Sequence, residues 1–112
     1  MDYRTFYSRI PDRRYADFKD FLVSAASRGG ARLAFRWRPG NDEEEVRLSF
    51  AELGDRAAGL ASRFLAAGLV RGDRIAVLSE NRPEWCVSYL GIVANGFVVV
   101  PLDTSLDEAG LE

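Results

Sequence analysis

Few side chains in this sequence of 112 residues are suited to chemistry, and they do not form a recognisable set. The chain contains one cysteine, Cys86, one lysine, Lys19, and no histidine. Without histidine, a histidine-dependent catalytic triad or zinc site cannot form from these residues. Cys86 lies in an apolar stretch, which favours a buried structural thiol over a nucleophile.

Residues 42–45, Asp-Glu-Glu-Glu, are the cluster whose residue types could hold a metal ion. Carboxylate oxygens are good ligands for Mg²⁺ and Ca²⁺. However, consecutive carboxylates on an exposed loop repel one another and are normally hydrated. A solvated acidic turn is therefore the preferred interpretation, and a metal site is the weaker one.

Basic residues are concentrated in the first 40 positions, which hold nine Lys or Arg against four Asp, although the net charge of the chain is −2. Such a concentration can mark contact with nucleic acid. Here the basic residues are scattered between aromatic ones and no nucleic-acid motif is present. We expect a solvated face and no nucleic-acid partner.

The composition, 47% hydrophobic and 29% charged residues, is typical of a soluble globular protein. Residues 1–112 are expected to form a single domain, with residues 1–14 as an irregular arm. The apolar runs are too short for a transmembrane segment, and the first residues do not resemble a secretory signal. The expected location is cytoplasmic.

The central stretch, residues 73–103, predicts a strand, a helix and a second strand. Residues 75–78 and 97–100 are short apolar runs without alternation, as in parallel strands that are buried on both faces. Asn81, Pro83 and Glu84 predict the start of the helix through a capping box, and Asn95-Gly96 predicts its end. The apolar face of this helix is expected to hold Trp85, Tyr89, Ile92 and Val93, widened by Cys86, Leu90 and Ala94.

The rest of the chain completes an α/β fold class: a partial N-terminal subdomain with an antiparallel hairpin, a parallel strand–helix–strand core and three helices. Helices are predicted near residues 15–28, 50–67 and 82–95, a hairpin near 32–49, and parallel strands near 74–79 and 97–101. Ser49 and Glu52 form a second capping box. The side chains expected to face inward in the other elements are Phe18, Phe21, Leu22, Ala25, Leu33, Phe35, Trp37, Val46, Leu48, Phe50, Leu53, Ala57, Leu60, Ala61 and Phe64.

A third capping box at residues 105–108, Ser-Leu-Asp-Glu, predicts a helix that the sequence does not complete. A helix of one or two turns at a terminus is marginal by itself. We therefore expect the sequence to be a fragment of a larger domain.

Four sequence blocks resemble the N-terminal portion of the adenylate-forming, AMP-binding acyl-CoA synthetase family. Residues 48–53 (LSFAEL) are similar to its aromatic-x-Glu-Leu helix start, residues 68–78 (GLVRGDRIAVL) to its turn and strand, residues 81–85 (NRPEW) to its second helix start, and residues 96–102 (GFVVVPL) to its following strand. Residues 78–85 look most like the branch of long-chain fatty acid:CoA ligases. Phe97 departs from the small residues that the family usually has there.

This resemblance implies a two-step reaction in the full-length enzyme, which uses ATP, Mg and coenzyme A. The carboxylic acid attacks ATP to form an acyl-adenylate, and coenzyme A then displaces AMP. The family's phosphate loop and later catalytic lysine have no counterpart in these residues. We therefore assign no residue of this chain to a catalytic, cofactor-binding or metal site, and whether the chain is itself an enzyme stays open.

Two functional hypotheses follow. In the first, the chain is an inactive N-terminal scaffold fragment of an ATP-dependent fatty acid:CoA ligase, and its partner is the remainder of that enzyme. In the second, it is a free-standing α/β interaction module that kept the ligase scaffold. As an isolated fragment, the chain is expected to form a homo-oligomer, because separation from the rest of the enzyme would expose apolar surface near residues 97–100 and on the outer side of residues 85–93.

Overall fold

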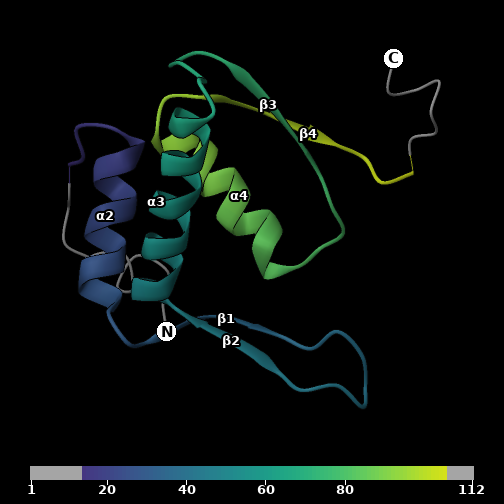
Figure 1. Cartoon of the computed structure of the whole chain (residues 1–112). Coiled ribbons are helices and arrows are strands. Elements are labelled where there is room, and N and C mark those ends of the chain that lie inside the picture. Colours follow the sequence, from purple (N-terminus) through teal and green to yellow (C-terminus); the bar gives the residue numbers. More distant parts are fainter. Residues whose placement is uncertain (1–13, 106–112) are drawn as a thin grey trace, which may run out of the picture.

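Helix α4 (Pro83–Ala94) is the element that joins the packed parts of this computed structural model, which describes residues 14–105 (Figure 1). Its side chains take part in each of the three core clusters. Ala94 packs with Leu22 and Ala57, Val87 packs with Leu48 and Leu53, and Ile92 packs with Val77 and Phe97. The helix is covered on more than one side, as its broad apolar face predicts.

Strands β3 (Arg74–Leu78) and β4 (Val98–Leu102) form a parallel pair, which confirms the strand–helix–strand core. Their register runs from Arg74 opposite Val98 to Leu78 opposite Leu102. Helix α4 is the crossover connection that a parallel pair requires. The fold class is therefore α/β, with three helices, this parallel pair and an antiparallel hairpin within the described residues.

The start of α4 differs from the predicted capping box. Arg82 is the N-cap residue, its side chain makes no capping hydrogen bond, and Pro83 is the first helical residue. The carboxylate of Glu84 instead accepts hydrogen bonds from the Arg82 guanidinium, with an Nε–Oε2 distance of 2.8 Å. The prediction of Asn81 as the cap was wrong by one residue, since Arg82 has the extended backbone of an N-cap, with φ of −155° and ψ of 163°, and the helix begins at Pro83.

The end of α4 agrees with the sequence. Asn95 is the C-cap residue, and Gly96 has a φ of 82°, the left-handed conformation that glycine adopts without steric cost. The buried face is less well predicted, because Val87 and Gly91 are buried whereas Trp85 and Tyr89 are only half-buried.

Helix α2 (Phe18–Gly29) begins later than the sequence predicts, because the side chain of Asp17 caps it by accepting from the N–H of Asp20 at 2.8 Å. Leu22 is its buried residue. Phe18 and Phe21 are 36% and 41% exposed, so the prediction that they face a core is wrong for the described part of the chain.

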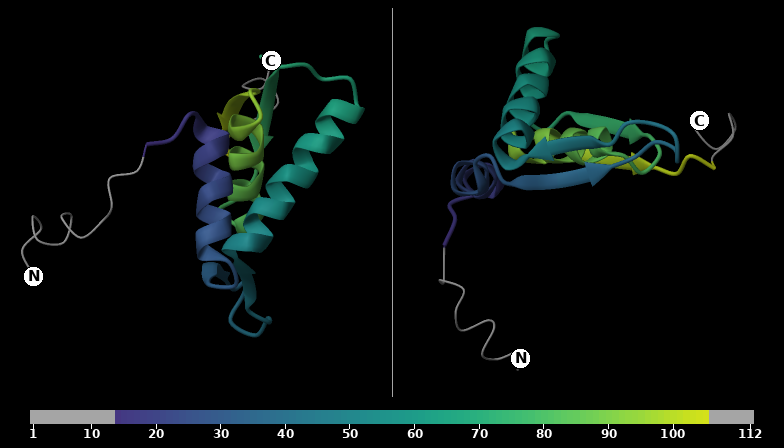
Figure 2. Two further views of the ribbon diagram at one scale, coloured as in Figure 1. Left: turned by 90° about the vertical axis from the view of Figure 1, so that its left-hand side faces the viewer. Right: turned by 90° about the horizontal axis from the view of Figure 1, so that it is seen from below.

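Helix α3 (Phe50–Ala66) begins as predicted, since Ser49 Oγ accepts from the N–H of Glu52 at 3.1 Å. It lies beside α2 and α4 (Figure 2), and it buries Leu53, Ala57 and Ala61. The predicted stripe is confirmed at these positions, while Phe50, Leu60 and Phe64 are half-buried.

The hairpin consists of β1 (Leu33–Trp37) and β2 (Val46–Ser49), which pair in the antiparallel direction. Leu48 is buried, at 1% exposure, as expected. The register shifts between Leu33 and Phe35, and Leu33 is 46% exposed. This irregularity explains why the alternation of the sequence fails at Leu33.

The predicted arm (residues 1–14, apart from Arg14) and most of the third capping box (residues 106–108) lie outside the described residues. Within residues 14–105, none of the helices is long and apolar enough to cross a bilayer.

Candidate functional site

A polar cleft lies where the two parallel strands end at their carboxyl edge. Its volume is about 620 Å³. In α/β proteins, ligands bind outside the carboxyl ends of parallel strands, so this edge is the first place to look for a site. The cleft is lined by Ser79, Glu80, Asn81, Trp85, Pro101, Leu102, Asp103 and Thr104.

The polar side chains of this cleft combine two carboxylates with hydroxyl, amide and indole groups. The N–H of Ser105 donates to Asp103 Oδ1 at 2.9 Å, and this bond lowers the pKa of the Asp103 carboxyl. Ser79 Oγ donates to the carbonyl oxygen of Glu80 at 3.0 Å. The lining contains no arginine or lysine to hold phosphate. The cleft can therefore bind hydroxyl groups or a cation, but it does not assemble a nucleophile with a base.

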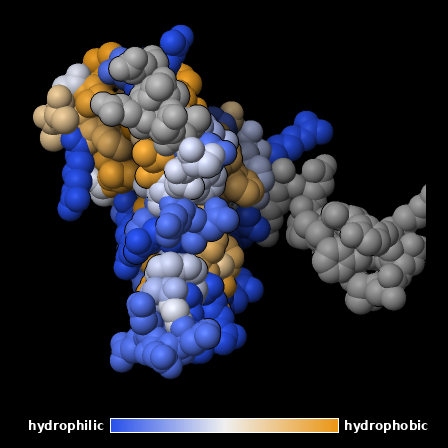
Figure 3. Space-filling model, turned by 90° about the vertical axis from the view of Figure 1, so that its right-hand side faces the viewer, coloured by the Kyte–Doolittle hydropathy of each residue, from blue (hydrophilic) through white to orange (hydrophobic). Residues whose placement is uncertain are grey.

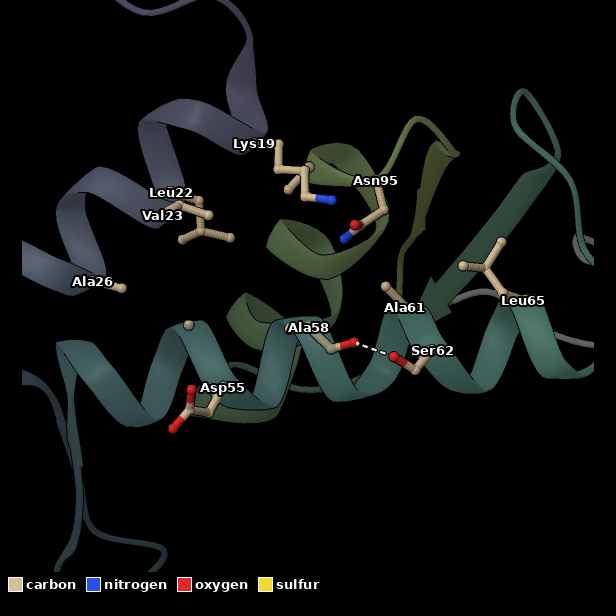
Figure 4. Close-up of a pocket in the computed structure, with 12 residues that line it drawn as sticks. Lys19, Leu22, Val23, Ala26, Asp55, Ala58, Ala61, Ser62, Leu65 and Asn95 are labelled. Atoms are coloured by element: carbon tan, nitrogen blue, oxygen red, sulfur yellow. Dashed lines mark hydrogen bonds between the residues drawn. The ribbon is translucent and has the colours of Figure 1, made fainter.

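A second groove, of about 400 Å³, separates α2 from α3 and ends at the last turn of α4 (Figure 4). Its walls are mainly apolar and include Leu22, Val23 and Leu65. Figure 4 shows Lys19 and Asn95 together at one end, whereas Asp55 projects from α3 away from them. These polar groups do not converge on one point, so the groove offers packing surface and not a catalytic arrangement.

Cys86 lies in a third, smaller cleft between the hairpin and the start of α4, beside Phe35, Trp37 and Trp85. The thiol is half-buried, and this burial raises its pKa above the ordinary value. A raised pKa reduces the thiolate fraction at neutral pH, and the thiolate is the reactive form. The structure therefore supports the interpretation of Cys86 as a structural thiol.

The acidic run of residues 42–45 is divided between two environments. Asp42, Glu43 and Glu44 are exposed in the turn of the hairpin. Glu45 is only 19% exposed at its side chain, and it pairs with Arg36 at 2.6 Å and with Arg47 at 3.1 Å. Hydrogen bonds from these two arginines lower the pKa of the Glu45 carboxyl. Among residues 14–105, no group of three His, Cys, Asp or Glu side chains is placed to hold a metal ion.

Sequence reasoning missed the cleft at the carboxyl edge, although a signal for it was present. Ser79 ends one predicted parallel strand, Glu80 and Asn81 directly follow it, and Asp103 and Thr104 follow soon after the other. Parallel strands bring their carboxyl ends to the same edge, so these side chains had to meet.

The parallel pair is packed on one face only within the described residues. Ile75, Val77 and Val99 lie in the core cluster that includes α4. On the other face Leu78 is 51% exposed and Val98 is 46% exposed. Figure 3 shows apolar surface gathered over the upper part of the molecule, which holds these strands, above a hydrophilic hairpin. Parallel sheets almost always have both faces covered, so this part of the fold is not closed by residues 14–105.

Comparison with known proteins identifies the family to which the chain is similar. Residues 22–112 match the family of AMP-binding enzymes. The chain is 38% identical over 110 residues to acyl-coenzyme A synthetase ACSM3, mitochondrial, from Rattus norvegicus, a match that covers 92% of this chain and 18% of that protein. It is 36% identical over 62 residues to the long-chain-fatty-acid–CoA ligase FadD13 of Mycobacterium tuberculosis, covering 55% of this chain and 12% of the relative.

Among solved structures, the N-terminal domain of FACL13 from Mycobacterium tuberculosis matches with a TM-score of 0.73 and 28% identity, over 85% of this chain and 23% of that chain. The chain thus spans less than a quarter of each of these proteins. Residues 22–112 match the family model, and α2 to β4 share the fold of that solved structure. This chain therefore belongs to the AMP-binding enzyme family.

Proposed function

We propose that this chain is the N-terminal scaffold of an ATP-dependent acid:CoA ligase. In the reaction that family resemblance implies, a carboxylate oxygen attacks the α-phosphate of ATP and pyrophosphate leaves. The thiol of coenzyme A then attacks the acyl carbon, and AMP leaves as the acyl-CoA forms. The residues of this chain contribute to that enzyme by building and positioning one layer of its large domain.

The uncovered face of β3 and β4 is the observation that carries this proposal. A two-stranded parallel sheet with Leu78 and Val98 exposed is unusual in a finished α/β domain. The open edges of both strands also carry unpaired backbone groups that further strands can satisfy. The remainder of the parent enzyme is the proposed partner, because it would supply both the missing strands and the missing cover.

The chain alone is proposed to be inactive. The described residues hold no Gly-rich loop with a lysine against which ATP phosphates could rest, and Lys19 lies in the apolar groove between α2 and α3. ATP, Mg²⁺ and coenzyme A would therefore bind to other parts of the enzyme. A cytoplasmic location, where these cofactors are supplied, belongs to the same proposal.

A fatty acid is the proposed acid substrate. The resemblance of residues 78–85 to long-chain fatty acid:CoA ligases and the similarity to FadD13 support this choice. Other relatives carry other names, including 4-hydroxybutyrate–CoA ligase 1 of Metallosphaera sedula, which is 31% identical over 83 residues, 74% of this chain and 15% of the relative. A test of the substrate must therefore include short hydroxy acids beside fatty acids.

The test is to read the gene beyond the codon of Glu112 and to assay the protein made from the whole reading frame for acid-dependent exchange of pyrophosphate into ATP. We expect a Gly-rich, Lys-containing loop downstream and exchange that depends on a fatty acid. A stop codon directly after Glu112 would contradict the ligase scaffold and support the free-standing interaction module. Exchange with 4-hydroxybutyrate but not with any fatty acid would retain the ligase and overturn the proposed substrate.

A further inference from the structure

The outer face of the hairpin gathers three arginines around one carboxylate. Arg36 binds Glu45 in a bidentate manner, with Nε–Oε1 and Nη2–Oε2 distances of 2.6 and 3.2 Å. Arg47 Nε donates to the same Oε1 at 3.1 Å, and Arg38 Nη2 lies 3.6 Å from Oε2. Three positive charges and one negative charge leave this group with a net charge of +2.

Glu45 leaves most of the donors of this group free for another anion. Each guanidinium carries five N–H donors, so the three arginines offer about fifteen, while a carboxylate accepts about four hydrogen bonds. The arginine side chains are also accessible, with exposures of 63%, 53% and 66% for Arg36, Arg38 and Arg47. The carboxylate thus holds the guanidinium groups together without saturating them.

A cleft of about 370 Å³ lies at this group, lined by Arg36, Trp37, Arg38 and Glu45. The Trp37 ring is held from another side, because the Arg82 guanidinium carbon lies 5.0 Å from the centre of the ring. Arg82 in turn binds Glu84. The Trp37 ring thus lies against Arg82 on the side of the hairpin that faces α4, whereas Arg36 and Arg38, its neighbours in the chain, extend from the opposite face.

We propose that this hairpin face binds a compact phosphate-bearing anion, with Arg36 and Arg38 as the contacting residues and Arg47 as a supporting charge. Planar guanidinium groups match phosphate oxygens in geometry and make charge-assisted hydrogen bonds. Glu45 occupies part of the same positive surface and acts as an internal competitor. The recognised group is phosphate or diphosphate, either free or carried on a nucleotide.

The acidic turn of the hairpin limits the size of the anion. Asp42, Glu43 and Glu44 are exposed and follow Arg38 by only a few residues. They repel a long polyanion that extends from the arginines towards the turn, whereas a small anion beside Arg36 is partly screened from them at physiological ionic strength. The arrangement therefore favours a small phosphate compound over nucleic acid.

The alternative to an anion site is that Glu45 has a purely structural role in the hairpin, and the two roles predict different results. Arg36 and Arg47 are direct cross-strand partners, and like charges in that position destabilise a hairpin. If Glu45 serves only to relieve this repulsion, added phosphate compounds will not bind at the arginines, and removal of the Glu45 charge will not create a tighter anion site.

The two roles are separated by NMR titration of the chain with inorganic pyrophosphate, at ionic strength matched with sodium chloride. We expect saturable shifts at the Nε–H groups of Arg36 and Arg38, with weak affinity in the millimolar range. Arg38→Ala should weaken binding by about tenfold, the effect of one lost charge-assisted hydrogen bond. Glu45→Gln should tighten binding several-fold, and the matched control Arg63→Ala, on an exposed part of α3, should leave it unchanged.

Titration with adenosine diphosphate and with adenosine identifies the source of the anion. Equal affinity for pyrophosphate and adenosine diphosphate supports recognition of the phosphates alone, and tighter binding of the nucleotide supports an added contact of the nucleoside with the hairpin. The proposal is overturned if pyrophosphate causes no saturable shift, if adenosine binds as well as its diphosphate, or if Arg63→Ala weakens binding as much as Arg38→Ala does.

Discussion

Gly91 of α4 faces Ala57 of α3 so closely that a methyl group on Gly91 would be tighter than an ordinary van der Waals contact. A methyl group at Gly91 would lie 3.0 Å from the carbonyl oxygen and 3.4 Å from the Cα of Ala57. Ala57 is fully buried. The two helices therefore approach each other through backbone and small residues, and this contact sets the position of α4 between α3 and the parallel strands.

Gly91→Ala should destabilise the fold by about 1 to 3 kcal/mol, because the neighbouring atoms at Ala57 belong to a helix backbone that cannot move alone. Gly59→Ala is the matched control, since a methyl group there meets nothing within 4 Å. This control should stabilise the protein by about 0.4 to 1 kcal/mol through the unfolded state. Urea denaturation of both variants measures the difference, and equal effects of the two substitutions would show that the close contact is not formed.

Phe97→Ala should lower the free energy of unfolding by about 3 to 5 kcal/mol, because Phe97 is only 5% exposed. Its ring packs edge-on against Phe64, with 5.7 Å between the ring centres. Phe64→Ala should cost less, since Phe64 is half-buried. Thermal and urea denaturation compare the two variants, and a larger loss for Phe64→Ala would contradict this ranking.

Most elements of the fold could be predicted from the sequence, because their capping residues and apolar patterns agree with the side chains that are buried in the structure. Ser49 caps α3, Gly96 follows the end of α4, and the two apolar runs pair as parallel strands. The errors arose at residues whose burial depends on contacts between distant parts of the chain. The stretch of residues 97–100 was expected to form part of an exposed apolar edge, but Phe97 is buried against Phe64, a contact between residues too far apart in the chain for periodicity to reveal.

Acid should weaken the hairpin through Glu45. Its pKa is lowered, mainly by the hydrogen bond from Arg36, so the folded state holds the charged form more strongly than the unfolded state does. This contribution is present above the ordinary pKa of 4.5 and is lost as pH falls through the lowered folded value. An NMR titration of the Glu45 carboxyl carbon checks the direction, and a midpoint above the ordinary pKa would contradict the ion-pair cluster.

The isolated chain should self-associate through the uncovered face of the parallel pair, where Leu78 and Val98 are exposed. Apolar surface of this kind favours a homodimer or a larger assembly. Val98→Lys should shift the protein towards the monomer because it places a charge in that contact. The control Val70→Lys changes an exposed valine in the turn after α3. Light scattering over a wide concentration range is the measurement, and a strictly monomeric protein at high concentration would exclude such contacts.

The candidate sites were harder to predict than the fold, because they depend on which loops meet. The acidic run suggested a single solvated turn, but Glu45 lies on the hairpin among arginines from both strands. The meeting of Arg36 with Arg47 depends on strand register, which the long turn between the strands does not fix in advance. That no residue of this chain belongs to a catalytic, cofactor-binding or metal site stays a prediction, and binding and activity measurements test it.

Calorimetric titration of the isolated chain with ATP and Mg²⁺, in the presence and absence of a fatty acid, tests the scaffold role most directly. We predict no binding in the micromolar range and no release of pyrophosphate, because the described residues form no cradle for the triphosphate. Weak binding no tighter than that of pyrophosphate agrees with the arginine face of the hairpin. Saturable micromolar binding of ATP would contradict the account, since the chain would then hold a nucleotide site of its own.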